Sequence, residues 1–310
     1  MILTVTLNPS IDISYPLEAL ALDRVNRVEA VQKTAGGKGL NVTRVLAETG
    51  QAVVATGFLG GVLGDFLVYQ LKQKGIRNQF FRIKGETRNC IAMLHDGMQT
   101  ELLEAGPLIA SEEAAGFMAH LSRLAESCAV MTLSGSLPRG LEPDYYQRLI
   151  ANAKAYGCQT VLDCSGAPLR TVLEGKDKPV VIKPNLEELE ALLGRAIAPD
   201  TTALKEALNH SLFDGLEWII VSLGSKGAFA KHKNQCYLVR IPSIAVLNPV
   251  GSGDAAVAGI AWALAEGDDD ETLLKKANVL GMLNAQETRT DHVNMAHFDE
   301  LFDRIQVEEV

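Results

Sequence analysis

The sequence reads Asn248-Pro-Val-Gly-Ser-Gly-Asp-Ala-Ala-Val-Ala-Gly259 at the point that most constrains the fold. Gly251, Ser252 and Gly253 predict a tight turn that leads directly into the apolar helical pattern Ala255–Ala265. Glycines let a ligand approach the backbone closely, and the first amides of a helix have no partner within it. The turn and the helix start therefore predict an anion-binding site.

Asp254 stands at the mouth of this predicted site. A carboxylate there repels a phosphate, so it needs a chemical task. A fitting task is to act as general base for a hydroxyl that attacks a phosphoryl group, while the amides stabilise the charge. The alternative is an Asp that caps an ordinary helix, which is a common use of this residue. The other motifs of the chain decide between the two interpretations.

Composition and charge exclude several classes of protein. The chain has 310 residues, 47% of them hydrophobic, which is enough to bury a full core. A net charge of -9 argues against nucleic acid or an anionic membrane as the main partner, but a small anionic substrate is compatible with a local basic pocket. The five cysteines are far apart in sequence, so we expect reduced, mostly buried thiols in a cytoplasmic protein, with neither disulfides nor a zinc site. Met1–Leu7 has no basic leader and no apolar run is long enough to span a bilayer, so we expect neither a signal peptide nor a membrane anchor.

Short apolar, β-branched runs alternate with helical patterns along the chain. Such runs are typical of strands that are buried on both faces. Their order predicts an α/β fold with a doubly wound, mostly parallel sheet flanked by helices, in which ligands bind at the carboxyl ends of the strands. The predicted strands are Ile2–Leu7, Ala52–Leu59, Ala129–Leu133, Thr160–Asp163, Val180–Lys183 and Trp218–Leu223.

Two segments break this alternation. Residues 11–34 and 80–104 carry strand-like runs, Val25–Val31 and Cys90–Leu94 among them, but no helical pattern. We interpret them as a small antiparallel β lid that projects from the main sheet. Because no repeat, low-complexity tract or linker interrupts the chain, we expect one domain over residues 1–310, with the lid as part of it.

Further motifs follow predicted strands or open predicted helices. Gly36-Gly-Lys-Gly-Leu-Asn41 precedes a helix but has neither P-loop nor dinucleotide spacing. Thr6-Leu-Asn-Pro-Ser-Ile-Asp12 presents a carboxylate that suits two sugar hydroxyls, or else forms an Asx turn. Arg88 lies in the predicted lid, where its guanidinium fits a phosphate or is simply solvated. Three more polar turns follow strands, Ser134-Gly-Ser-Leu-Pro138, Lys183-Pro-Asn-Leu-Glu-Glu188 and Ser222-Leu-Gly-Ser-Lys-Gly227.

Together and in this order, these motifs resemble those of the ribokinase-like (phosphofructokinase B) carbohydrate kinases over essentially the whole chain. Thr6–Asp12, Gly85–Cys90 and Ser134–Pro138 resemble the hexose-phosphate branch of that family, and most of all the tagatose-6-phosphate kinases. The resemblance implies ATP and Mg²⁺ as cofactors, with K⁺ as a further candidate ion, and a homodimer joined through the lids.

The resemblance also implies a role for each matching residue. Asp254 matches the catalytic base, and Gly251, Ser252 and Gly253 match the anion hole. Contacts to sugar hydroxyls fall on Asp12 and Gly37, and the pocket for the substrate's own phosphate falls on Lys38, Asn41, Arg88 and Ser136. Contacts to the phosphates and Mg²⁺ fall on Lys183, on Asn185 and, through water, on Glu188. The nucleotide is lined by Ser222, Gly224 and Gly227, and adenine is enclosed by Asn278, Gly281 and Asn284.

The resemblance implies ATP-dependent phosphorylation of O1 of D-tagatose 6-phosphate, within lactose and galactose catabolism. The nearest alternative is a 1-phosphofructokinase, and fructose 6-phosphate is a further candidate substrate, because pockets discriminate weakly between epimers. A non-catalytic sugar-phosphate or nucleotide sensor on the same fold is the alternative from another class, against which Asp254 argues. A Rossmann-type dehydrogenase is disfavoured because G-x-G-x-x-G is missing.

Overall fold

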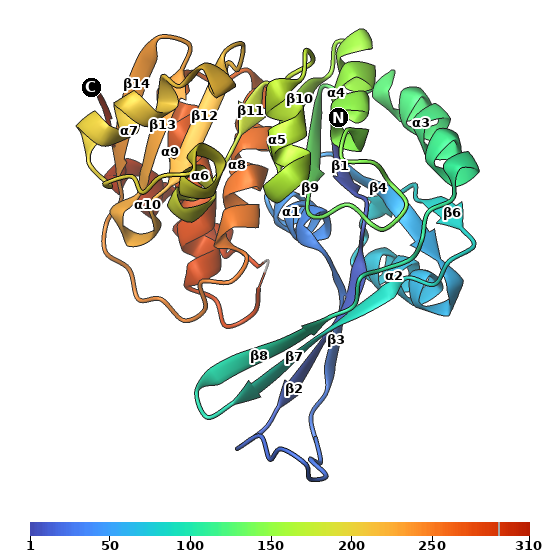
Figure 1. Ribbon diagram of the computed structural model, residues 1–310. Coiled ribbons are helices and arrows are strands. Elements are labelled where there is room, and N and C mark those ends of the chain that lie inside the picture. Colours follow the sequence, from blue (N-terminus) through green and yellow to red (C-terminus); the bar gives the residue numbers. More distant parts are fainter. Residues whose placement is uncertain (291) are drawn as a thin grey trace.

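The computed structural model describes residues 1–290 and 292–310. A large sheet crosses the molecule between layers of helices, and a smaller sheet projects away from it (Figure 1). The strand order of the large sheet is β15-β14-β13-β12-β11-β10-β9-β1-β4-β5, and β6 pairs with β4. This arrangement confirms the predicted fold class.

The central strands of the large sheet are parallel. They are β1 (Ile2–Thr6), β4 (Val53–Gly60), β9 (Val130–Ser134), β10 (Gln159–Asp163), β11 (Val181–Ile182) and β12 (Trp218–Ser222). All six predicted strands are therefore present, although β11 is shorter than its apolar run. Because β1 pairs with β4 on one side and with β9 on the other, the strand order reverses at β1. Ligands of doubly wound sheets bind beyond the carboxyl ends of the strands at such a point.

The edges of the large sheet were not predicted from the sequence. Short strands β5 (Arg77–Asn78) and β6 (Phe81–Ile83) add to β4. The other edge is antiparallel and consists of β13 (Ala228–His232), β14 (Gln235–Arg240) and β15 (Gln306–Glu309). These edge strands contain charged and polar residues, so they lack the continuous apolar run that marks a central strand.

The helices cover the two faces of the sheet, and most of them contribute to two large apolar cores, while α2 joins a third, smaller one with the base of the lid. One core contains side chains of α1, α8, α9 and α10, and the other contains side chains of α3 to α7. Alternation along β1 divides its side chains between them, since Ile2 joins the first core and Leu3 joins the second. The helices are α1 (Lys38–Glu48), α2 (Gly61–Gln73), α3 (Ser111–Ala125), α4 (Tyr145–Ala155), α5 (Gly166–Glu174), α6 (Leu186–Leu193), α7 (Thr201–Leu208), α8 (Ser252–Glu266), α9 (Asp270–Ala285) and α10 (Phe298–Arg304).

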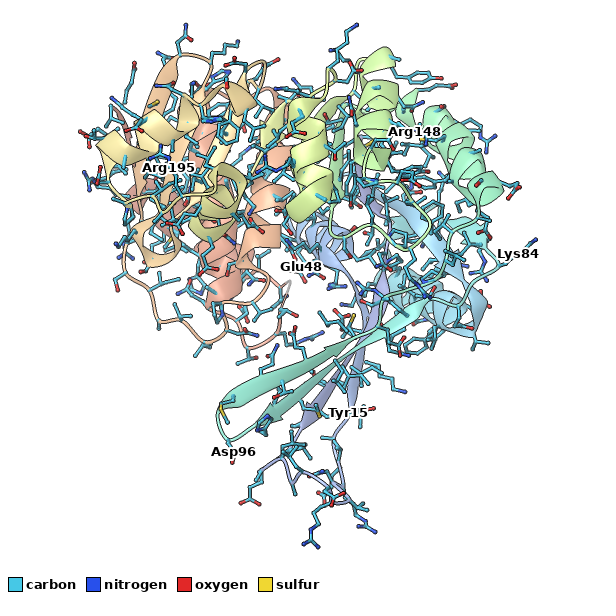
Figure 2. All side chains as sticks on the ribbon, viewed as in Figure 1. Tyr15, Glu48, Lys84, Asp96, Arg148 and Arg195 are labelled. Carbon is cyan, nitrogen blue, oxygen red and sulfur yellow. The ribbon has the colours of Figure 1, made fainter. Side chains whose placement is uncertain are left out.

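The smaller sheet is the predicted lid, with strand order β3-β2-β7-β8. Its strands are β2 (Ser10–Pro16), β3 (Gln32–Gly36), β7 (Arg88–His95) and β8 (Met98–Leu103). The outer pairs are antiparallel as expected, whereas the central pair β2–β7 is parallel. Figure 2 shows Tyr15 and Asp96 on the part of the lid that extends away from the large sheet.

Two details of the predicted lid are wrong. The run Val25–Val31 is not a strand, and Val25 is 79% exposed. A β-prone sequence forms a strand only where a partner supplies hydrogen bonds and packing. Phe81–Ile83, which we included in the lid, pairs with β4 of the large sheet instead.

The cysteines are mostly buried, as the sequence predicts. Cys128, Cys158, Cys164 and Cys236 are buried free thiols, and Cys90 is half-buried. The sulfurs of Cys128 and Cys158, distant in sequence, lie 2.7 Å apart. Within residues 1–290 and 292–310, no helix is both long enough and apolar enough to cross a membrane.

Candidate active site

Two helices begin at glycines near the carboxyl ends of the central strands. The N-cap of α1 is Gly37, with φ 107°, and the N-cap of α8 is Gly251, with φ 86°. Both values lie in the left-handed region, where glycine avoids the strain that a side chain would bring. Among the described residues, no side chain caps either helix. Both helix starts are therefore suited to bind anions, as the sequence predicts.

A hydrogen bond joins these two helix starts. Asn41, in the first turn of α1, donates from Nδ2 to Oδ2 of Asp254 in the first turn of α8, at 2.7 Å. The residues are 213 positions apart in sequence, and only the packing of α1 against α8 brings them together. Asp254 is 6% exposed, so this bond holds a buried carboxylate in one orientation.

Asp163 is a buried carboxylate that the sequence analysis did not identify as a site residue. It ends β10 and is 4% exposed. The ammonium of Lys38 lies 3.5 Å from Oδ2, and that of Lys183 lies 3.8 Å from Oδ1. A single Asp at a strand end gives no distinctive pattern in the sequence. Its importance follows from its position between two cations.

Three carboxylates surround the ammonium group of Lys38 and stabilise its positive charge. The carboxylate of Asp163 raises the pKa of Lys38; burial opposes this, and Asp254 and Glu188 add to the increase. Three carboxylates thus keep this side chain a cation. A Cβ atom added at Gly253 would lie 3.4 Å from the ammonium of Lys183, so this second cation lies beside the α8 turn. Two cations and a helix start converge here, which suits a transferring phosphate.

The Asn-x-x-Glu motif forms a reciprocal cap at the start of α6. The amide of Glu188 donates to Oδ1 of Asn185 at 2.8 Å, and the amide of Asn185 donates to Oε2 of Glu188 at 3.0 Å. Among the described residues, no cluster of three His, Cys, Asp or Glu side chains could hold a metal directly. The donors present fit Mg²⁺, which keeps several waters and binds through one or two carboxylates together with substrate phosphates.

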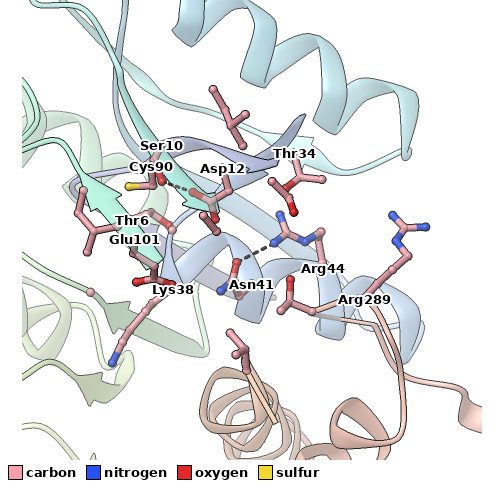
Figure 3. Close-up of a pocket in the computed structure, with 18 of the residues that line it drawn as sticks. Thr6, Ser10, Asp12, Thr34, Lys38, Asn41, Arg44, Cys90, Glu101 and Arg289 are labelled. Atoms are coloured by element: carbon pink, nitrogen blue, oxygen red, sulfur yellow. Dashed lines mark hydrogen bonds between the residues drawn. The ribbon is translucent and has the colours of Figure 1, made fainter. Parts of the chain in front are cut away.

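A cleft of about 1300 Å³ lies between the helix starts and the lid (Figure 3). The large domain and the lid both contribute to its wall. Asp12 lies on β2 of the lid and accepts a hydrogen bond from Oγ of Ser10 at 2.6 Å. A side chain at Gly36 would overlap the Asp12 carboxylate, so this glycine makes room for it. All six residues predicted to bind substrate line the cleft, namely Asp12, Gly37, Lys38, Asn41, Arg88 and Ser136.

Arg88 connects the lid to the carboxyl end of β1. Its Nε and Nη2 atoms donate to the carbonyl of Asn8 at 3.2 and 3.1 Å, and Nη1 donates to the carbonyl of Glu104 at 2.7 Å. The side chain of Asn8 in turn lies 3.4 Å from Oγ of Ser136. A guanidinium has five N–H groups, so these bonds orient Arg88 and use three of them. Two N–H groups remain for an anion among the described parts of the chain.

Comparison with known proteins agrees with this geometry. The model of the pfkB family of carbohydrate kinases matches residues 5–296. The chain belongs to the pfkB family of carbohydrate kinases. It is therefore an ATP-dependent sugar kinase.

Several solved structures superpose over nearly the whole chain. Phosphofructokinase-2 from Escherichia coli, in complex with potassium, has a TM-score of 0.89 and 26% identity, covering 97% of this chain and 98% of that one. A candidate 1-phosphofructokinase from Thermotoga maritima has a TM-score of 0.88 and 26% identity, covering 100% and 99%. A candidate phosphofructokinase from Staphylococcus aureus has a TM-score of 0.86 and 28% identity, covering 100% and 99%.

The remaining predicted residues of this pfkB kinase lie outside the cleft lining. Gly224 and Gly227, with φ 59° and 88°, shape the turn after β12, and Ser222 pairs with Asn185 through an isolated bridge. Asn278 donates to the carbonyl of Leu274 within α9. The contacts of all four residues with the nucleotide stay predictions.

Two α9 residues support the anion-binding turn from behind. Asn284 is fully buried and donates to the carbonyl of Val250 at 2.8 Å and toward Oγ of Ser252 at 3.3 Å. A Cβ atom at Gly281 would lie 3.2 Å from the carbonyl oxygen of Ser252, so the glycine allows α9 to pack closely here. Both residues act on the turn, and their predicted contact with adenine stays a prediction.

Proposed function

We propose that this kinase transfers the γ-phosphoryl group of ATP to O1 of D-tagatose 6-phosphate, forming D-tagatose 1,6-bisphosphate during lactose and galactose breakdown. The observation that carries the proposal is the position of Arg88 on the lid side of the cleft, with two N–H groups left for an anion. Lys38 and Lys183 lie together beside Asp163, where they suit the phosphate that is transferred. Arg88 therefore suits the substrate's own phosphate.

In the proposed reaction, Asp254 takes the proton from the sugar O1 as that oxygen attacks the γ-phosphorus. The backbone amides of Gly251–Gly253 stabilise the charge on the transferring group, and the ammonium groups of Lys38 and Lys183 flank it. The resemblance assigns Lys38 to the substrate's own phosphate instead, and its position with Lys183 beside Asp163 is the reason for this change. Asp12 accepts hydrogen bonds from the sugar hydroxyls and so orients O1. When bound through Glu188 and water, Mg²⁺ supplies further positive charge to the ATP phosphates.

Phosphorylation of fructose 1-phosphate is the second candidate function. The similarity to the candidate 1-phosphofructokinase, at 26% identity, favours it. The equal identity to phosphofructokinase-2, which was also solved in complex with fructose 6-phosphate, favours that sugar phosphate instead. Both substrates present a hydroxyl and a phosphate at opposite ends of a ketohexose. A cleft lined by Arg88 and by Asn41, the hydrogen-bond partner of Asp254, therefore suits either, and fructose 6-phosphate as well.

ADP release measured with a panel of acceptors tests this proposal. The panel contains tagatose 6-phosphate, fructose 6-phosphate, fructose 1-phosphate, free tagatose and ribose, at fixed ATP and Mg²⁺. We expect the highest kcat/KM with tagatose 6-phosphate. A higher value with fructose 1-phosphate would replace the proposal by the second candidate, and comparable turnover of ribose would reject both. Tight binding of a sugar phosphate without ADP release from any acceptor would indicate a sensor.

We also propose that the kinase is a homodimer joined through its lids. All six residues of β8 are exposed, and Met98, Leu102 and Leu103 are each at least 56% exposed. An edge strand with exposed apolar side chains is a ready site for pairing. We propose K⁺ as a further ion, because phosphofructokinase-2 was solved in complex with potassium. ADP release in K⁺ against N-methylglucamine buffers tests this second point.

A further inference from the structure

Arg44 lies behind the residue that orients the proposed base. It belongs to α1 and is 7% exposed. Its Nη2 atom donates to Oδ1 of Asn41 at 2.6 Å (Figure 3). Its Nη1 atom donates to the carbonyl of Ala35. Ala35 belongs to β3 of the lid. A continuous chain of hydrogen bonds thus runs from the lid strand through Arg44 and Asn41 to Asp254.

The polarity of the Asn41 amide depends on Arg44. An amide side chain accepts at its oxygen and donates at its nitrogen. Because a guanidinium can only donate, it requires the Asn41 oxygen on its side, which leaves Nδ2 to face the Asp254 carboxylate. The reversed amide would set donor against donor at Arg44 and acceptor against acceptor at Asp254. A residue at position 44 without an N–H donor removes the Arg44 part of this preference and leaves Asp254 alone to orient the amide.

We propose that Arg44 is a positioning residue that holds Asp254, through the Asn41 amide, in a fixed position relative to the lid strand β3. The inference rests on the proposed role of Asp254 as the base. Arg44 itself takes no proton and transfers no group. Its effect is to keep the Asp254 carboxylate oriented toward the sugar hydroxyl when the lid strand is in place. A misoriented Asp254 carboxylate slows turnover without weakening ATP binding.

A double-mutant cycle tests this inference. We expect Arg44→Met to lower kcat about ten- to hundredfold, with the KM for ATP changed less than twofold. In an Asn41→Ala background, the same substitution should lower kcat less than threefold further, because the relay is already broken. Arg170→Met is the matched control, since Arg170 also donates to a backbone carbonyl, that of Leu192, but does not line the cleft, and it should leave kcat unchanged.

The outcomes separate this inference from the proposed function. If the effects of Arg44→Met and Asn41→Ala on kcat multiply independently, Arg44 is not a positioning residue. The same follows if Arg44→Met keeps the wild-type kcat while Asp254→Asn loses it. Retained activity of Asp254→Asn would instead reject the proposed base. If Arg44→Met melts well below the wild type, the cycle is repeated with Arg44→Lys, which keeps a donor toward Asn41 and should restore part of kcat.

A second, independent observation concerns Cys128 and Cys158. Their sulfurs are 2.7 Å apart. Cys158 directly precedes β10, and Cys128 lies two residues before its parallel partner β9. Both side chains are buried, but the residues on either side of each cysteine are exposed. The pair lies at the amino ends of strands whose carboxyl ends carry Ser134 and Asp163. It is therefore separate from the active site.

We infer that this pair is a thiol–disulfide site for small disulfides such as oxidised glutathione. One cysteine thiolate attacks a glutathione sulfur, which forms a mixed disulfide and releases one reduced glutathione. The second cysteine then attacks the protein sulfur of that mixed disulfide and displaces the second glutathione. The product is a Cys128–Cys158 disulfide, with two reduced glutathione molecules that carry the two thiol protons.

Mass spectrometry of the folded kinase after exposure to oxidised glutathione tests this site. We expect a loss of about two mass units, a cross-linked peptide pair containing Cys128 and Cys158, and a rise of several degrees in Tm, because the bond closes a long loop. Cys128→Ser should abolish the cross-link, whereas Cys164→Ser should not. A persistent glutathione adduct on one cysteine, a cross-link between other cysteines, or no reaction at all would each reject the site.

Discussion

The large sheet buries its strands, whereas the lid sheet leaves much of its surface exposed. All five residues of β9 are buried, and all six of β8 are exposed. Asp163 and Asp254, at 4% and 6% exposure, belong to the large domain. The lid contributes Asp12 and Arg88 from strands that are only partly covered. From this difference we predict a division of tasks in which the buried groups control turnover and the lid groups control which ligand binds.

Burial explains why the two regions differ. A carboxylate removed from water interacts more strongly with nearby cations and dipoles, so Asp163 and Asp254 have fixed partners. The base of the lid is also fixed, since Ile11 and Ile13 pack with the apolar residues of α1 and α2. Beyond that base, no helix among residues 1–290 and 292–310 covers the lid (Figure 1), and another copy of the lid would provide a second layer.

The largest effect is expected for the proposed base. Asp254→Asn preserves shape and hydrogen-bonding reach but removes the proton acceptor, so kcat should fall by roughly two to four decades. Binding of ATP and sugar phosphate, measured by calorimetry, should change little. A variant that keeps more than a tenth of the wild-type kcat would show that Asp254 is not the base.

Substrate charge should have the next largest effect. Tagatose 6-phosphate should exceed free tagatose in kcat/KM by about a hundredfold or more, because an oriented guanidinium left without its anion is costly. Initial rates of ADP release for the two sugars under identical ATP and Mg²⁺ measure this ratio. Comparable rates for the two sugars would mean that the lid side of the cleft does not bind a phosphate, and would favour a neutral-sugar kinase.

Removal of the lid cation should have an intermediate effect. Arg88→Ala should raise the KM for the sugar phosphate by about ten- to hundredfold, which corresponds to a charge-assisted hydrogen bond of about 1.5–3 kcal/mol. The KM for ATP should change far less. Arg139→Ala is a suitable control, since Arg139 also donates to a loop carbonyl, that of Gly106, but does not line the cleft. An equal increase in both KM values would assign Arg88 a purely structural task.

The smallest effect on chemistry is expected at the lid surface. Leu102→Glu places a charge on the exposed face of β8 and should shift the kinase from dimer to monomer, as measured by sedimentation velocity. The turnover of saturating substrate should fall only a fewfold, since the buried groups are unchanged. Val62→Glu, at an exposed apolar position on α2, serves as the control. A wild-type chain that sediments as a monomer at micromolar concentration would reject the lid-to-lid interface.

The sequence determined most of the central fold. Continuous apolar runs such as Ile2–Leu7 and Ala129–Leu133 can be buried only in a sheet covered on both faces, so their positions could be predicted. Glycines before Lys38 and before Asp254 marked the starts of both helices that are suited to bind anions. These features are local, because each depends on a few neighbouring residues.

The tertiary structure decided what depends on distant partners. Val25–Val31 has the composition of a strand but no neighbouring strand, so its sequence was misleading. Asp163 has no distinctive motif, and its position between Lys38 and Lys183 results from the order of strands in the sheet. The bond between Asn41 and Asp254, and the approach of Cys128 to Cys158, likewise require packed elements from separate parts of the chain. Local propensity sets the elements, whereas burial and long-range packing decide which side chains meet.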